Sequence, residues 1–229
     1  MTMTRARRPI PLALTALVAF FSALAALTVA NGQSAAAHGG PSHHHPAAFT
    51  KKEVALHDGM RKLWEDHIVW TRLAIISLTT DAPDTQATVG RLLQNQTDIG
   101  DAVKPFYGQA AGDELTRQLR LHILIAAEVV TAAKAGDAAK LADAQARWQE
   151  NANDIAGVLA SVNPRFWKLA RMKEEMRMHL ELTTAEAVAR IQGNFAADVA
   201  AYDRIHDHIL HMADLLSGGL IKQFPDRFH

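Results

Sequence analysis

The stretch LTRQLRLHILIA occupies residues 115–126 of this chain. Its apolar residues recur three and four positions apart, as on one face of an α-helix, and His122 stands on the same face. Similar stretches place His67 55 residues before His122 and His179 57 residues after it. Recurrence at such a period is typical of one supersecondary unit used several times. The sequence therefore predicts a threefold repeat.

A polar partner follows each histidine at a nearly constant distance. The partners are Asn95, Asn151 and His208, which lie 28, 29 and 29 positions further along the chain. Turn signals fall midway, because Gly136–Asp137 and Gly193–Asn194 each combine a glycine helix end with an N-cap residue. Each unit is therefore predicted to be a helical hairpin in which the histidine and its partner face each other at one height.

Six helices are expected, and no stretch alternates like a β-strand. They run from Thr50 to about Thr79, from Asp81 to about Pro105, from about Asp113 to Ala135, from Asp137 to Asn163, from Pro164 to Gly193 and from Asn194 to about Ser217. We predict an all-α helical bundle of about six helices, arranged as three repeated helical hairpins, which forms a single domain over residues 50–229.

The amino terminus has the pattern of an export signal over residues 1–37. Three arginines precede an apolar stretch at residues 10–30, and three alanines at 35–37 form a cleavage point. We expect an exported protein of the periplasm, the cell envelope or the extracellular space. An uncleaved apolar stretch of this length would instead anchor the chain in the membrane. Residues 38–49 are expected to form a His-rich flexible leader.

Composition excludes several classes of function. Removing the signal takes away three of the 24 basic residues and none of the 24 acidic ones, so nucleic acid is not an expected partner. The absence of cysteine excludes disulfides, thiolate metal sites, covalent c-type haem attachment and cysteine nucleophiles. No Glu-x-x-His, phosphate-binding glycine loop, Gly-x-Ser-x-Gly or His-Glu-x-x-His motif is present.

The first two hairpins predict a buried polar layer. A buried polar group needs a hydrogen-bond partner, so histidine is expected to pair with asparagine and to fix the helix register. A catalytic site needs different chemical groups, whereas residues that only pack the helices can be the same in every repeat. The recurrence of the same pair therefore favours a structural role. The layer comprises His67, Asn95, Asp98, His122, Asn151 and Asp154.

The third hairpin departs from the pattern, because His208 and His211 stand where its predecessors have Asn and Asp. They face Glu175 and His179 across the hairpin. Converging imidazoles are ligands for copper, zinc or nickel, so these four residues form the expected metal site. The alternative to a metal site is that one histidine is buried in the core and the others are solvated on a polar helix face.

Copper is favoured over zinc and nickel as the bound ion. Met172, Met176 and Met212 lie one turn from His179 or His208, and thioether beside imidazole suits copper(I), although methionine at helical spacing is also ordinary core. The leader offers a second set of metal ligands, which are His38, His43, His44 and His45.

Four segments resemble a poorly characterised family of small exported bacterial all-helical proteins. They are LWEDHIVWTR (63–72), LLQNQTDIG (92–100), KPFYG (104–108) and ILHMAD (209–214), and the likeness covers most of residues 56–228. Members are often named glycosyltransferase or acetylglutamate kinase. Those activities normally use nucleotide-binding α/β folds, which this sequence does not predict. The resemblance implies a helical fold and no site.

Three functional hypotheses follow. The first is an exported helical protein that binds a transition-metal ion as a carrier, buffer or sensor component. The second is a metal-free envelope scaffold that binds a protein partner and whose histidine layer is structural. The weakest is an enzyme that uses the layer, with Glu186 as the nearest buried acid, although a salt bridge from Glu186 to Arg72 or Arg190 is the favoured role.

Overall fold

The computed structural model describes residues 49–229, and this part of the chain is all α-helical with no β-strand. The prediction of a six-helix bundle is confirmed. The elements are α2 (Lys51–Thr80), α3 (Thr85–Tyr107), α4 (Gln109–Ala135), α5 (Ala138–Val162), α6 (Leu169–Ile191), α7 (Phe195–Gln223) and the short 3₁₀-helix η1 (Pro225–Arg227).

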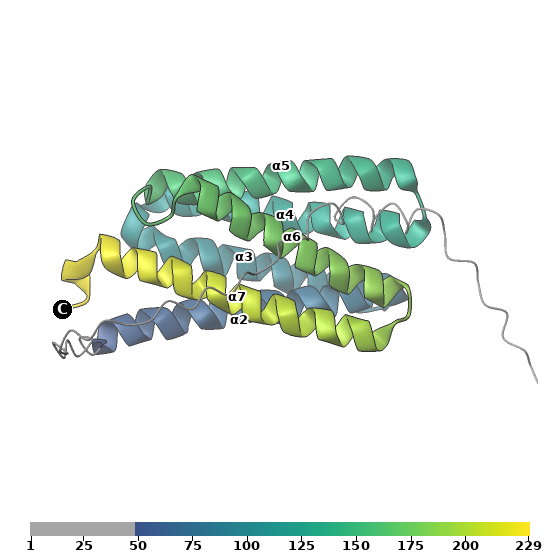
Figure 1. Ribbon diagram of the computed structural model, residues 1–229, viewed down its shortest axis with the longest axis horizontal. Coiled ribbons are helices and arrows are strands. Elements are labelled where there is room, and N and C mark those ends of the chain that lie inside the picture. Colours follow the sequence, from purple (N-terminus) through teal and green to yellow (C-terminus); the bar gives the residue numbers. More distant parts are fainter. Residues whose placement is uncertain (1–48) are drawn as a thin grey trace, which may run out of the picture.

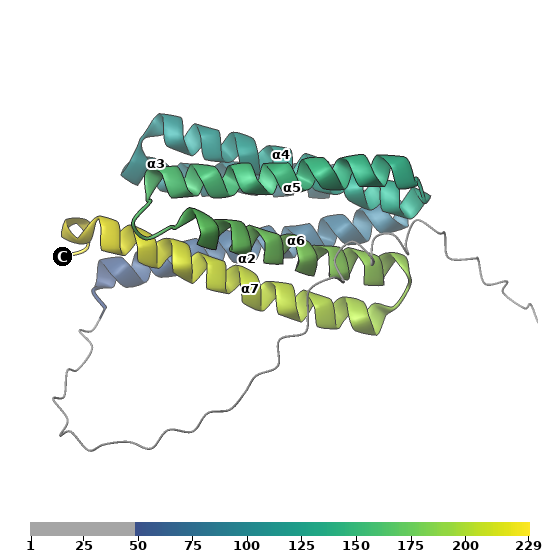
Figure 2. The same ribbon diagram turned by 45° about the horizontal axis from the view of Figure 1, so that its top comes forward.

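The helices form a closed ring. Each long helix packs against the next one in the chain, and α7 packs back against α2. Figures 1 and 2 show the helices running roughly side by side, with the end of α7 close to the start of α2. Helix α2 also contacts α4 and α6, so the first members of the three hairpins lie nearest to the axis of a pseudo-threefold bundle.

Local side-chain caps begin several helices where the sequence predicts. Thr50 and Glu53 form a capping box at the start of α2. Asp137 accepts a hydrogen bond from Lys140 N at 3.1 Å, and Asn194 accepts one from Ala197 N at 3.2 Å. The turns within the second and third hairpins therefore lie at the predicted positions.

The boundary between α3 and α4 differs from the prediction. Helix α3 continues through Pro105 to Tyr107, and α4 begins at Gln109 instead of about Asp113. Gly108 separates the two helices with φ 85°, a backbone conformation that favours glycine. The break is thus at the glycine and not at the proline.

Two predicted boundaries of the third hairpin are wrong for a common reason. Helix α6 begins at Leu169 and not at Pro164, and α7 continues through Gly218 and Gly219 to Gln223. Trp167 is buried in the connection before α6, and a Cβ atom built on Gly219 would lie 2.0 Å from Trp167 Nε1. Gly219 therefore lets the indole of Trp167 pack closely against α7, and the helix continues through this glycine.

The predicted signal at residues 1–37 and the leader histidines His38, His43, His44 and His45 lie outside the described residues. In the part that the structure describes, no helix has both the length and the apolar character needed to cross a membrane.

Candidate functional site

The three equivalent histidines meet on the bundle axis. His67 of α2, His122 of α4 and His179 of α6 are all buried. The ring centroid of His179 lies 5.8 Å from that of His67 and 5.9 Å from that of His122. His208 of α7 adds a fourth buried imidazole 6.2 Å from His179. The repeat therefore places four imidazoles together around His179.

Burial keeps these rings neutral. Desolvation lowers the pKa of His67 to about 3 and that of His122 to about 4. The pKa of His179 is well below its ordinary value, because burial is reinforced by its three histidine neighbours. Burial also lowers the pKa of His208. At neutral pH each ring therefore carries one N–H donor and one lone pair.

In the second hairpin the structure brings His122 and Asn151 together. Asn151 Oδ1 accepts from His122 Nδ1 at 2.8 Å, and the indole N–H of Trp148 donates to His122 Nε2 at 3.1 Å. Asn151 Nδ2 in turn donates to Gln118 Oε1 at 3.0 Å. Asn151 and Trp148 thus satisfy both ring nitrogens of His122, and Gln118 accepts from Asn151. The sequence pattern predicted neither Trp148 nor Gln118 as a hydrogen-bond partner in this layer.

In the first hairpin the partner of the histidine is Gln96 and not Asn95. Gln96 Nε2 lies 3.1 Å from His67 Nδ1, whereas Asn95 Nδ2 donates to Leu63 O at 3.0 Å. Both amides are fully buried, since Asn95 and Gln96 each follow Leu92 at helical spacing. The four-residue spacing from Leu92 could have predicted that Gln96 is buried. The comparison between repeats favoured Asn95 as the partner of His67 instead.

The two predicted acids of the layer do not join it. Asp98 is partly exposed and accepts from Gln94 at 3.0 Å, with Arg91 3.8 Å away. Asp154 is exposed on α5. Both lie on the outer flank of their helix, because each stands two steps of three residues beyond a buried residue, Leu92 or Trp148, and is therefore about 120° away from it around the helix.

The third hairpin gathers a different group, hereafter the Glu175 group: Glu175, His208 and His211. His208 Nε2 donates to the backbone carbonyl of Glu175 at 3.2 Å, and this leaves the lone pair on Nδ1. That Nδ1 lies 3.7 Å from Glu175 Oε2, and His211 Nε2 lies 3.6 Å from Glu175 Oε1. A carbonyl that fixes the tautomer of a histidine is typical of metal-ligating imidazoles.

A guanidinium lies against the Glu175 group. Arg171 Nη2 is 2.5 Å from Glu175 Oε1 and donates to His211 Nε2 at 3.1 Å. Arg171 and His211 are exposed, whereas Glu175 and His208 are buried. The group therefore faces solvent on one side, and a positive charge already lies there.

The predicted ligand His179 lies beside this group and not within it. Its ring faces the bundle axis, and its Nδ1 atom is buried with no hydrogen-bond partner among residues 49–229. Within the same residues, no three or more His, Cys, Asp or Glu side chains are already arranged to hold a metal ion.

Glu186 lies on the far side of the layer in an ion-pair network. Arg72 Nη1 lies 2.8 Å from Glu186 Oε1 and 2.9 Å from Asp198 Oδ1. Burial raises the pKa of Glu186 to about 7. This network joins α2, α6 and α7, and it agrees with the expected pairing of Glu186 with Arg72.

The fold and the site together define an all-α bundle with a buried histidine layer and a carboxylate–histidine group at its edge. Comparisons with models of protein families, with curated proteins and with solved structures found no match to this chain. Function must therefore be inferred from the geometry of the site.

Proposed function

We propose that this protein binds a transition-metal ion through His208, His211 and Glu175, and that it serves as an exported metal carrier, buffer or sensor component. The observation that carries the proposal is the convergence of two imidazole nitrogens, one from His208 and one from His211, on the carboxylate of Glu175. His208 Nε2 donates to a backbone carbonyl, so its Nδ1 is available to an ion.

The separations within the Glu175 group support this ligand set. Two atoms each about 2.1 Å from one ion, at tetrahedral or square angles, lie roughly 3.0–3.4 Å apart. The nitrogen-to-oxygen distances of 3.7 and 3.6 Å exceed this by a few tenths of an ångström. Small rotations of the two rings would close the difference once the exposed side chain of Arg171 moves away.

Copper is the proposed ion, ahead of zinc and nickel. Met172, Met176 and Met212 are buried on the same two helices as Glu175 and His208. Thioether and imidazole together favour copper(I), whereas zinc and nickel gain less from methionine. A carboxylate and two imidazoles also accept copper(II).

The proposal is tested by elemental analysis after loading with copper, zinc or nickel and exhaustive dialysis. The full chain is used with His38, His43, His44 and His45 replaced by alanine, so that the leader cannot contribute ligands. We expect about one equivalent of copper per chain, and none in a His208→Asn/Glu175→Gln variant. A His206→Ala variant, which changes a nearby histidine outside the group, serves as the matched control. Unchanged copper content in the double variant contradicts the proposal.

A second candidate is a metal-free envelope scaffold that binds a protein partner. The observation that favours it is the hydrogen bonding of His122, which protein groups complete without an ion. If none of the three metals is retained by the leader-replaced protein, the scaffold is the better account.

A further inference from the structure

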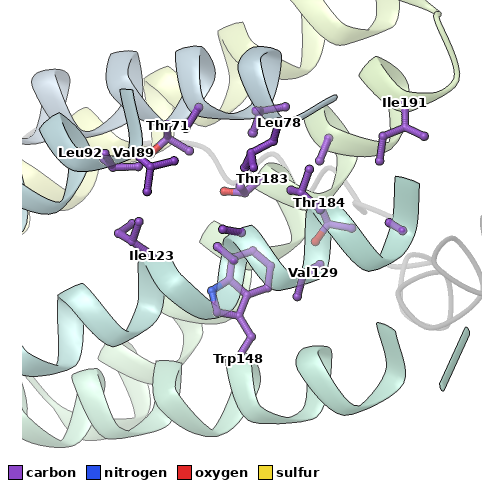
Figure 3. Close-up of a pocket in the computed structure, with 17 residues that line it drawn as sticks. Thr71, Leu78, Val89, Leu92, Ile123, Val129, Trp148, Thr183, Thr184 and Ile191 are labelled. Carbon is purple, nitrogen blue, oxygen red and sulfur yellow. The ribbon is translucent and has the colours of Figure 1, made fainter. Parts of the chain in front are cut away.

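An apolar slot runs along the bundle axis on the other side of the histidine layer. It lies between α2, α4 and α6, with α3 and α5 adding to its walls (Figure 3), and it is partly open to solvent. Its walls include Leu78, Ile123, Val129, Val130, Ala187 and Ile191. None of the residues that line it is charged.

The slot is long and narrow. Its lining residues extend along α4 from Ile123 to Ala133, which is about 15 Å at the helical rise per residue. The cavity volume is only about 50 Å³. A slender molecule fits this shape, whereas a fused ring system does not.

One end of the slot lies next to the histidine layer. Thr71, Ala126 and Thr183 line the slot one helical turn beyond His67, His122 and His179. The hydroxyls of Thr71 and Thr183 donate to the carbonyls of His67 and His179, each at 2.8 Å. These two hydroxyls are therefore already used by the backbone.

Thr184 is the exception among the threonines of the slot. It is more than nine-tenths buried, and its Oγ1 atom has no hydrogen-bond partner among residues 49–229. Figure 3 shows it among the apolar walls. A buried hydroxyl without a partner is costly, and an apolar cavity of this kind does not hold ordered water well. A ligand with one hydrogen-bonding group would satisfy it.

We infer that the slot binds a slender, uncharged, mainly apolar molecule whose single hydrogen-bonding group meets Thr184, such as an unbranched alcohol. A charged head group is excluded, because no lining side chain would neutralise it. The slot suits an unbranched chain, because its walls run along about three turns of α4. The slot and the Glu175 group share no residue, so either can be present without the other.

The test uses the full chain with labelled isoleucine methyl groups, titrated with 1-octanol and with n-octane supplied through the headspace. We expect saturable shifts of the Ile75, Ile123 and Ile191 methyl signals with both probes. Thr184→Val should weaken 1-octanol binding about three- to tenfold and leave n-octane binding unchanged, because only the alcohol uses the hydroxyl. Thr131→Val, on the exposed face of α4, is the matched control and should change neither.

A second variant, Ala187→Leu, fills the slot and should abolish binding of both probes while the circular dichroism of the folded bundle is retained. The inference is overturned if the wild-type methyl signals do not shift, if the shifts persist in Ala187→Leu, or if Thr184→Val weakens both probes equally.

Discussion

Arg171 Nη2 lies 2.5 Å from Glu175 Oε1, one turn earlier on the same helix. The guanidinium also donates to His211, so the cation contacts two of the three proposed metal ligands. The Glu175 carboxylate cannot pair fully with the guanidinium and with a metal ion at the same time. Arg171 and a metal ion are therefore expected to compete for the Glu175 group.

Replacing Arg171 should therefore strengthen metal binding. We expect Arg171→Ala to lower the dissociation constant for copper about three- to tenfold, equivalent to roughly 0.7–1.4 kcal/mol. Competition titration with a chelator of known affinity measures the change. Arg177→Ala is the control, since Arg177 pairs with Glu174 and Glu181 on the same helix and does not contact either histidine. Equal effects of the two variants would show that general surface charge is responsible.

His122 of the second hairpin should contribute to the stability of the fold. His122→Ala removes a buried ring and leaves the Trp148 indole and Asn151 without their partner, so we expect a loss of about 2–4 kcal/mol in unfolding free energy. His206→Ala, near the surface, should cost less than about 0.5 kcal/mol. Urea unfolding of the metal-free proteins measures both. Similar losses in the two variants would argue against a packing role for His122.

Acid should weaken the bundle through its buried histidines. The pKa values of His67 and His122, about 3 and about 4, are below the ordinary 6.5, so the unfolded chain takes up protons that the folded one does not. Their contribution to stability is complete above about pH 6.5 and is lost as the pH falls. Together they account for roughly 3 kcal/mol between pH 6.5 and 5.0.

Glu186 changes the unfolding free energy in the opposite direction over the same pH range. Its pKa of about 7 is raised above the ordinary value, so the folded chain gains protons there and is stabilised as the pH falls towards 5. Urea unfolding at pH 6.5 and 5.0 should therefore show a steeper loss in Glu186→Gln than in the unaltered protein. A pH-independent unfolding free energy in Glu186→Gln would contradict the neutral state of the buried rings.

Two adjacent glycines of α7 should respond oppositely to alanine. At Gly219 the new Cβ would lie 2.0 Å from Trp167 Nε1, whereas nothing lies within 4 Å of a Cβ at Gly218. We expect Gly219→Ala to lose at least about 2 kcal/mol and Gly218→Ala to gain up to about 1 kcal/mol, measured by thermal unfolding. Equal effects would show that Trp167 does not require the close approach.

The helices and the common height of the histidines could be predicted because both depend on helical periodicity and local caps. The failures involve tertiary packing. Comparison of repeats paired His67 with Asn95, but Gln96 is the residue that contacts the His67 ring. Gly218–Gly219 is a usual stop signal, and only the position of Trp167 shows why α7 continues. Arg171 and Glu175 stand four residues apart, a spacing that allows an ion pair on a helix. The contact of Arg171 with His211 of α7 depends instead on how the two helices pack.

The most direct measurement is anomalous X-ray diffraction from crystals of the copper-loaded protein, recorded at the copper absorption edge. We expect one strong peak about 2.0–2.2 Å from His208 Nδ1, His211 Nε2 and a carboxylate oxygen of Glu175, with Arg171 displaced. A loaded crystal in which Arg171 still contacts Glu175 and no peak lies among these three residues would contradict it.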